Sequence, residues 1–316
     1  MNKKILFGIV FLFLIVLAGY LANAFFWRTP DKKSIVSFEI KSGENLSQVG
    51  SNLQKTGLLE NPFLFKIYFK LGKLEKNIQP GIFKIGRGNS VSKLVKIITN
   101  RDLAGKKLTF LEGWTVRDYL EYLKKNNLAD EKNANELSKS GSLEGYLFPD
   151  TYFVPANITL KDLIKIMRDN FNAKAGVILE QAARSQKKTA LELLTVASLV
   201  EAEANTEEDR RLTADIIWRR LDIGMPLQLD STVNYVTGNK KPAISLAEQT
   251  IESLFNTYKY KGLPPWPINN PGLAAIMAAI APKRNDYWFF LTGNDGKMYY
   301  ARNLKEHEEN KNRYLR

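Results

Sequence analysis

Hydrophobic residues are most concentrated at the start of the chain. The run from Ile5 to Phe26 is apolar except for Asn23, and two lysines precede it. At about 1.5 Å of rise per helical residue, such a run covers the hydrocarbon core of a bilayer. The pattern predicts a transmembrane anchor over residues 1–28. A cleavable signal peptide is the alternative, because Ala22-Asn23-Ala24 fits a small-residue cleavage site, and either interpretation places the body of the protein outside the cytoplasmic membrane.

The next segment combines the alternation of strands with the periodicity of helices. Ser34 to Ile40 and Gly81 to Ile85 are predicted strands. Asn61-Pro62 and Ser90 each begin a predicted helix. We therefore predict a small α+β unit over residues 34–102. Its core positions include Leu46, Val49, Leu53 and Leu94.

A similar pattern recurs further along the chain. Ile40-Lys-Ser-Gly-Glu-Asn-Leu resembles Phe110-Leu-Glu-Gly-Trp-Thr-Val, and Leu94-Val-Lys-Ile resembles Leu163-Ile-Lys-Ile. Residues 105–170 are therefore a candidate second copy of the unit. Coincidence between amphipathic helices is the alternative.

An almost wholly apolar helix is predicted over residues 189–203. Thr189 and Glu192 form a capping box at its start. The turns that follow carry too few polar residues for a surface helix, so most of it should be buried. A carboxylate at the end of such a helix is poorly solvated, which raises its pKa toward that of a general acid.

Two acids, Glu201 and Glu203, compete for this role. Two residues turn a helix by about 200°, so both cannot face one cleft. Glu201 stacks over Ala197 and Ser198, whose small side chains are expected to leave room for a ligand. We therefore predict that Glu201→Gln abolishes activity and that Glu203→Gln is far milder. The alternative is that both acids are solvated where the helix leaves the core.

The remainder of the chain contains a helix with an acidic first turn that ends at Gly224, and a polar loop in which Asp230 or Ser231 could cap another helix. Residues 262–272 form a loop rich in Pro and Gly, which suits a rigid groove wall. Residues 287–301 are a predicted hairpin.

Composition narrows the chemistry. The chain has 316 residues, 44% of them hydrophobic, and a net charge of +13, which suggests attraction to anionic lipids or wall polymers. The basic residues are dispersed without a recognition motif, so nucleic acid is not an expected partner. There is no Cys, and the one His, His307, lies in a charged segment, which excludes the usual zinc sites and Cys-dependent catalysis. No nucleotide-binding glycine motif occurs. Catalysis by Asp or Glu carboxylates is the chemistry that these exclusions leave.

Several motifs resemble those of the YceG-like family of endolytic murein transglycosylases. They occur in the family's order and cover about residues 36 to 309. The motifs are Leu143-Glu-Gly-Tyr-Leu-Phe-Pro-Asp-Thr-Tyr152, Ala197-Ser-Leu-Val-Glu-Ala-Glu203, Arg220-Leu-Asp-Ile-Gly-Met-Pro-Leu-Gln-Leu-Asp230, Asn256-Thr-Tyr258, and Gly262-Leu-Pro-Pro265 through Asn270-Pro-Gly272.

This resemblance implies an α+β fold with a single-pass helix in the cytoplasmic (inner) membrane. It also implies a LysM-like unit over residues 34–102 and a mixed α+β catalytic domain over residues 103–316 on the external or periplasmic side. The family's catalytic Glu corresponds to Glu201. Its other motif residues correspond to Glu144, Asp150, Gln228, Asp230, Asn256 and Tyr258, which are expected to bind substrate.

The implied reaction uses no cofactor or metal. Glu201 would protonate the leaving oxygen of the MurNAc–GlcNAc bond of a nascent glycan strand, and the 6-hydroxyl of MurNAc would close on its own anomeric carbon. A 1,6-anhydro end results, and strand elongation stops. The implied partners are peptidoglycan strands, the membrane and peptidoglycan synthases.

Three departures from the family pattern lie near the expected groove. Trp266 stands where the family usually has Gly, Ser-Leu-Phe precedes Asn256, and Ser231 replaces a Pro. Two other functions stay open. One is a lysozyme-type hydrolase with Asp230 or Glu144 as its second carboxylate. The other is a non-catalytic scaffold that binds the wall.

Overall fold

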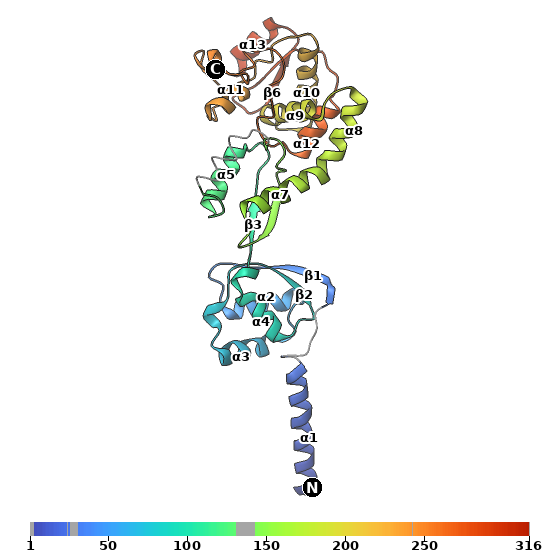
Figure 1. Cartoon of the computed structure of the whole chain (residues 1–316), viewed down its shortest axis with the longest axis vertical. Helices are drawn as coiled ribbons and strands as arrows, with labels where there is room; N and C mark the ends of the chain where they lie inside the picture. The colour runs from blue at the N-terminus through green and yellow to red at the C-terminus, as the bar shows by residue number, and fades with distance from the viewer. Residues whose placement is uncertain (1–2, 24, 26–30, 131–142, 242, 316) are drawn as a thin grey trace. The chain divides into compact units, whose positions relative to one another are not determined.

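The structure is a computed structural model that describes the chain except for residues 1–2, 24, 26–30, 131–142, 242 and 316. The chain forms two compact units (Figure 1). The first comprises Met1–Leu108 with Thr151–Ile158, and the second comprises Thr109–Asp150 with Thr159–Arg316. Both combine helices with strands, which confirms the predicted mixed α+β fold.

The first described helix is α1, Lys3–Ala22. Within the part of the chain that the structure describes, no helix is both long and apolar enough to span a bilayer. The anchor over residues 1–28 stays a prediction.

A four-stranded sheet in the order β1-β2-β3-β4 organises the first unit. The strands are β1 (Asp31–Ile40), β2 (Gly81–Arg87), β3 (Gly105–Thr109) and β4 (Thr151–Pro155). β1 and β2 pair antiparallel, with Ile40 opposite Gly81. The two strands predicted between residues 34 and 85 are therefore confirmed.

Besides α1, the described part of this unit contains two short 3-10 helices, η2 (Glu75–Asn77) and η3 (Arg101–Leu103), and three α-helices, namely α2 (Leu46–Lys55), α3 (Pro62–Gly72) and α4 (Val91–Thr99). Asn61 and Ser90 cap the last two of them, as their positions predicted. Val49, Leu53 and Leu94 are fully buried in the core, and Leu46 packs against it partly buried. Burying each such side chain contributes roughly 1.5–3 kcal/mol.

The second unit is mainly helical. The helices in its described residues are α5 (Val116–Lys125), α7 (Leu160–Phe171), the π-helical turn η4 (Asn172–Gly176), α8 (Val177–Gln186), α9 (Ala190–Glu203), α10 (Glu207–Asp222), α11 (Asp230–Thr237), the 3-10 helix η5 (Glu248–Thr250), α12 (Leu273–Ile280) and α13 (Leu304–Tyr314). The predicted hairpin is confirmed as β5 (Phe289–Thr292) paired antiparallel with β6 (Met298–Ala301).

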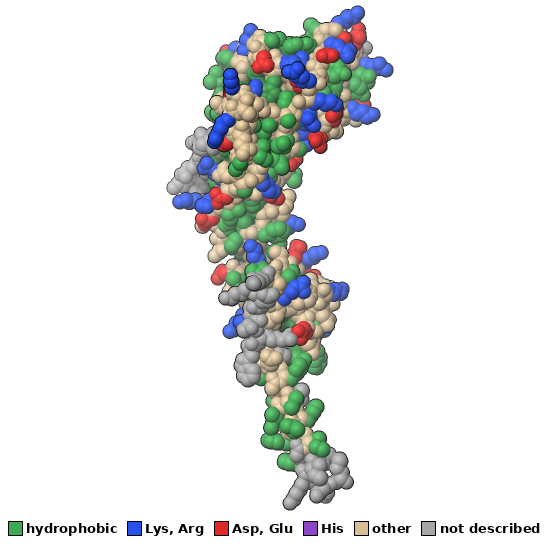
Figure 2. Space-filling view, turned by 90° about the vertical axis from the view of Figure 1, so that its right-hand side faces the viewer, with side chains coloured by type: hydrophobic (Ala, Val, Ile, Leu, Met, Phe, Trp, Pro, Cys, Tyr) green, Lys and Arg blue, Asp and Glu red, His purple; other side chains and the backbone are tan. Residues whose placement is uncertain are grey.

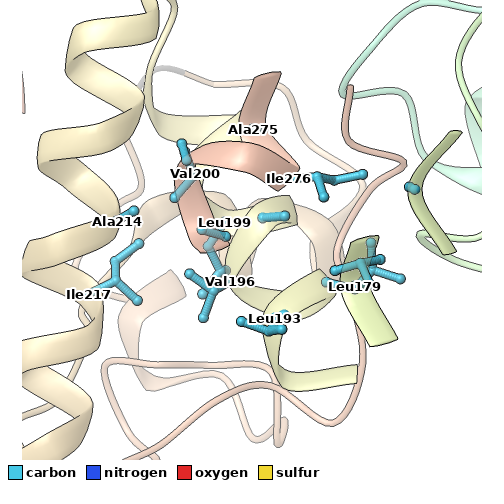
Figure 3. Packing of buried hydrophobic residues seen from close by; sticks show 14 of the residues in the cluster. Leu179, Leu193, Val196, Leu199, Val200, Ala214, Ile217, Ala275 and Ile276 are labelled. Atoms are coloured by element: carbon cyan, nitrogen blue, oxygen red, sulfur yellow. The ribbon is translucent and has the colours of Figure 1, made fainter. Parts of the chain in front are cut away.

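Helix α9 lies at the centre of this unit. The predicted capping box of Thr189 and Glu192 is present, and every residue from Leu193 to Val200 is buried. Figure 3 shows Val196 and Leu199 of α9 packed among side chains of α8, α10 and α12. Because close packing holds α9 on all sides, the polar residues at its C-terminal end are held in fixed positions.

The predicted cap of α11 is wrong. Asp230 is the first residue of α11 rather than its cap, and neither Asp230 nor Ser231 makes a capping hydrogen bond. Both side chains bind other partners, described below. Residues 105–170 are divided between the two units, and their relation to residues 34–102 stays a prediction.

Charge is spread over the surface. On the face seen in Figure 2, Lys and Arg side chains are scattered among acidic and apolar ones. This agrees with the dispersed basic residues of the sequence and fits a solvated, lysine-rich surface.

Candidate active site

The end of α9 presents Glu201 and Glu203 to different surroundings. The Glu201 carboxylate accepts a hydrogen bond from Arg210 Nη2 at 2.7 Å and from the backbone N–H of Gly272 at 3.0 Å. Its side chain is only 5% exposed. Burial raises the pKa of Glu201, while the Gly272 and Arg210 contacts oppose the rise. These two donors favour the ionised form of the carboxylate but do not cancel the effect of burial, so the pKa of Glu201 stays above its usual value.

Glu112 completes this cluster. Arg210 Nη2 lies 3.9 Å from Glu112 Oε2. The Glu112 carboxyl also lies against Gly272, so closely that a Cβ atom at position 272 would overlap it. Sequence reasoning missed Glu112, because Phe110-Leu-Glu-Gly-Trp-Thr-Val was interpreted only as part of a repeat.

The space expected beside Glu201 is filled, which corrects the prediction of a ligand site over Ala197 and Ser198. Both residues are fully buried. Ser198 Oγ accepts the N–H of Ile268 at 3.0 Å, and its carbonyl accepts Asn269 Nδ2 at 2.8 Å. The small side chains leave room for the proline-rich loop rather than for a ligand.

Glu203 faces an open cavity. Ser231 Oγ donates to Glu203 Oε1 at 2.6 Å. Burial, reinforced by the nearby charge of Asp230, raises the pKa of Glu203 to about 7, although the Ser231 contacts oppose the rise. The cavity has a volume of about 600 Å³. A carboxyl that titrates near neutrality beside such a space is suited to exchange protons with a ligand.

Three predicted site residues line the same cavity, namely Gln228, Asp230 and Tyr258. Tyr258 Oη donates to Asp230 Oδ1 at 2.5 Å. Gln228 has a positive φ of 55°, and its N–H donates to Thr257 O at 3.1 Å. Its side chain is exposed. The structure therefore gathers these residues around Glu203.

Arg220 also lines this cavity and was not assigned from the sequence, although one of the quoted motifs begins with it. Its guanidinium is buried and donates to the carbonyls of Leu227 at 2.7 Å and Trp288 at 2.6 Å. Burial lowers the pKa of Arg220 to about 10. These contacts fasten the end of α10 to the backbone at Leu227 and Trp288.

Asn256 holds the loop that carries Tyr258. It is fully buried, and Nδ2 donates to the carbonyls of Gln249 and Ile251, each at 2.9 Å. Its Oδ1 accepts the N–H of Tyr258 at 3.0 Å. The Asn256 amide is thus directed at the backbone of its own loop.

Glu144 is the centre of a buried network. Its Oε1 accepts from Val116 N at 2.9 Å and from Asn270 Nδ2 at 3.3 Å, and its Oε2 accepts from Tyr235 Oη at 3.3 Å. Burial raises the pKa of Glu144 to about 8. Asn270 is followed by Pro271 and Gly272, and the N–H of Gly272 binds Glu201. By binding Asn270, Glu144 therefore helps to hold in place the loop that contacts Glu201.

Trp266 joins the same network. Its Nε1 donates to Tyr235 Oη at 3.1 Å, and its ring packs edge-on against Phe255. The Trp266 side chain therefore packs between α11 and the segment that contains Phe255.

Asp150 lies apart from both acids of α9. Lys174 Nζ lies 2.8 Å from Asp150 Oδ2, and Asn170 Nδ2 donates to the same oxygen at 3.0 Å. These contacts fasten the segment around Asp150 to α7 and η4. Among the described residues, no three His, Asp or Glu side chains are grouped to hold a metal ion.

Comparisons with known proteins place these motifs in a family. A sequence model of the YceG-like family matches residues 38–313. The endolytic murein transglycosylase of Bacillus subtilis is 32% identical over 90% of this chain and 86% of its own length. The endolytic murein transglycosylase of Streptococcus pneumoniae strain R6 is 29% identical over 96% of this chain, which spans 63% of that protein. The crystal structure of a YceG-like protein from Listeria monocytogenes matches with a TM-score of 0.58 and 26% identity, over 88% of this chain and 99% of the other.

Proposed function

Because the chain belongs to the YceG-like family, we propose that it is an endolytic murein transglycosylase, which cuts glycosidic bonds within peptidoglycan strands. The observation that carries the proposal is the Glu203 carboxyl in its cavity, with a pKa of about 7 and with Gln228, Asp230 and Tyr258 around it. Cutting a glycosidic bond requires a proton on the leaving oxygen. Glu203 is the acid best placed to supply it.

We assign the proton transfer to Glu203 in preference to Glu201, the acid that the sequence predicts. Glu201 is ion-paired with Arg210. The Arg210 ion pair favours the ionised form of Glu201 and so works against proton donation. Glu203 has a hydroxyl as its hydrogen-bond partner and opens on a space that can hold sugar rings. The prediction for Glu201 and the proposal for Glu203 are separated by the variants described in the Discussion.

The reaction balances with one carboxyl. Glu203 donates its proton to the glycosidic oxygen as the bond from that oxygen to the anomeric carbon of MurNAc breaks. The 6-hydroxyl of the same MurNAc then bonds to that carbon, and its proton passes to the ionised Glu203. No water is added, and a 1,6-anhydro end forms. The substrate acetamido group stabilises the cationic centre in place of a second acid.

The other predicted residues divide into two groups. Gln228, Asp230 and Tyr258 line the cavity and are proposed to contact the glycan. Glu144 and Asn256 bind loop backbone, and Asp150 binds side chains of α7 and η4, so we propose that these three position the site.

Product analysis tests the proposed function. Peptidoglycan digested by the full chain should yield 1,6-anhydro-MurNAc ends, identified by mass spectrometry of the released muropeptides, and average strand length should fall. Reducing ends would identify a lysozyme-type hydrolase instead. Binding to the wall without any new ends would identify a non-catalytic scaffold.

We further propose that residues 1–28 anchor the protein in the cytoplasmic membrane, with a LysM-like unit over residues 34–102 that positions the glycan for residues 103–316. The apolar run from Ile5 to Phe26 supports the anchor. Confinement there would limit cutting to nascent strands near the synthases that make them. The full chain should fractionate with membranes, with its body open to external protease. A mature protein beginning at Phe25 would contradict a retained anchor.

A further inference from the structure

Helix α3 of the first unit leaves large apolar side chains in contact with water. One side of the helix packs into the core through Leu64, Phe65 and Phe69. The opposite side carries Phe63 and Leu71, which are 68% and 81% exposed. A grouped set of exposed apolar side chains, unlike a single one, indicates a surface that meets a partner.

The exposed side chains follow the period of the helix. At about 100° per residue, positions 63, 67 and 71 lie within about 80° of one another around the axis. Ile67, between the two exposed residues, is partly exposed. Lys66 and Lys70 lie beside this stripe, within about 60° of Phe63. The outer face of α3 therefore carries an apolar stripe next to a row of lysines.

The charge of this face is positive. The two lysines are the only charged residues of α3. Lys73 and Lys76 follow the helix, both exposed, and the acids that flank it are Glu60 and Glu75. Lysine stems can lie along an apolar surface while their ammonium groups reach anionic groups nearby. A face of this composition fits the boundary between the headgroups and the acyl chains of an anionic bilayer.

The N-terminal segment contacts the same helix. The centroids of the Phe25 ring and the Tyr68 ring of α3 lie 5.9 Å apart. Tyr20 of α1 lines a small cavity together with Leu64 of α3. Residues 23–30 alone connect α1 to β1, and a segment of that length spans at most about 30 Å. The chain itself therefore keeps α3 close to the end of α1.

We propose that α3 is an interfacial helix that lies on the outer surface of the cytoplasmic membrane. Phe63, Ile67 and Leu71 enter the acyl-chain boundary, and the lysines meet anionic phospholipid headgroups. The inference rests on the proposed anchor of residues 1–28, which brings the helix to that surface. Because the anchor holds α3 nearby, this second contact forms at a high effective concentration and needs little affinity of its own. Two contacts with one bilayer limit how far the first unit can swing on its tether.

A fluorescent label tests the contact. The chain has no Cys, so Leu71→Cys gives the full chain a single site for a polarity-sensitive nitrobenzoxadiazole label. In phosphatidylcholine vesicles with about 30% phosphatidylglycerol, spin-labelled acyl chains should quench this label at least about twofold more than a label at the control site. The control is Ser37→Cys, at an exposed position of β1, a strand on the other side of this unit from α3 (Figure 1).

Charge reversal tests the lysines in the labelled Leu71→Cys chain. Lys66→Glu with Lys70→Glu should lower the ratio of membrane-bound to free label about tenfold. Lys93→Glu with Lys96→Glu changes the net charge equally at two exposed positions of α4 and should leave the ratio unchanged. Thermal unfolding checks that each variant is folded. Equal losses in both pairs would contradict a specific role for the lysines of α3, and the label comparison decides the contact if a pair fails to fold.

The outcomes are separable. If the chain is embedded in the vesicles but the labels at positions 71 and 37 are quenched equally, the interfacial helix is overturned while the anchor stands. An emission shift that occurs in native membranes and not in lipid vesicles overturns the lipid contact and assigns this face to a membrane protein. A full chain that does not associate with vesicles overturns the anchor and this inference together. The formation of 1,6-anhydro ends is measured on isolated strands and tests the proposed reaction separately.

Discussion

Glu203→Gln is expected to abolish strand cleavage while leaving the fold and glycan affinity largely intact. The amide is nearly isosteric and still accepts the hydrogen bond from Ser231, but it cannot donate and then retrieve a proton. Because general acid–base catalysis contributes about 10²–10⁴-fold, turnover should fall by at least that factor. The measurement is the rate at which 1,6-anhydro ends form on isolated strands. A sedimentation assay with the same strands reports binding.

Glu201→Gln is the matched control on the same helix. Its amide oxygen can still accept the N–H of Gly272, but the ion pair with Arg210 is lost. We expect lower stability and measurable turnover. The sequence alone predicts the opposite order of effects. Complete loss in Glu201→Gln together with near-normal turnover in Glu203→Gln would reject our assignment and restore the one made from the sequence.

The pH profile gives an independent check on Glu203. The protonated carboxyl is the active form, and its pKa is about 7, so kcat/KM should decline as pH rises through about 7. Ser231 favours the ionised form, so Ser231→Ala should move this decline to higher pH. Asp230, Tyr258, Arg220, His307 and Lys311 also line the cavity and are unchanged in the variant. A decline at the same pH in both proteins would show that Glu203 is not the titrating acid.

The sequence predicted the elements near the site better than the site itself. The capping box and the apolar run fixed α9 and its burial, because both are local signals. Helical geometry also separated Glu201 from Glu203 correctly. It could not show which acid met a cavity, because that depends on where the loop at residues 263–272 and the start of α11 pack.

Ser198 illustrates the difficulty. A small residue one helical turn before an acid suggests space for a ligand. In the structure, the Ser198 side chain instead accepts the backbone N–H of Ile268, 70 positions later in the chain. Glu144 and Asn256 were identified as motif residues, but their buried hydrogen bonds to distant backbone could not be inferred from spacing. Glu112 was passed over because its partners, Arg210 and Gly272, come from remote parts of the chain.

The second large effect concerns stability. Arg210→Ala should lower the free energy of unfolding by about 3 kcal/mol at neutral pH, because it leaves a buried carboxylate without its cation. The side chains of Glu201 and Arg210 are only 5% and 14% exposed, so solvent cannot replace the lost partner. Urea unfolding of the full chain measures the loss.

The loss should also depend on pH. Burial already raises the folded-state pKa of Glu201 above 4.5, and removing Arg210 raises it further. A raised folded-state pKa means that the folded state binds the proton more tightly than the unfolded state, so stability falls as pH rises above the unfolded value. The cost of Arg210→Ala should therefore be largest near pH 7 and shrink toward pH 5. In a Glu201→Gln background no buried charge is stranded, so the same substitution should cost far less and lose its pH dependence. An equal, pH-independent cost in both backgrounds would mean that Arg210 stabilises the fold by packing alone.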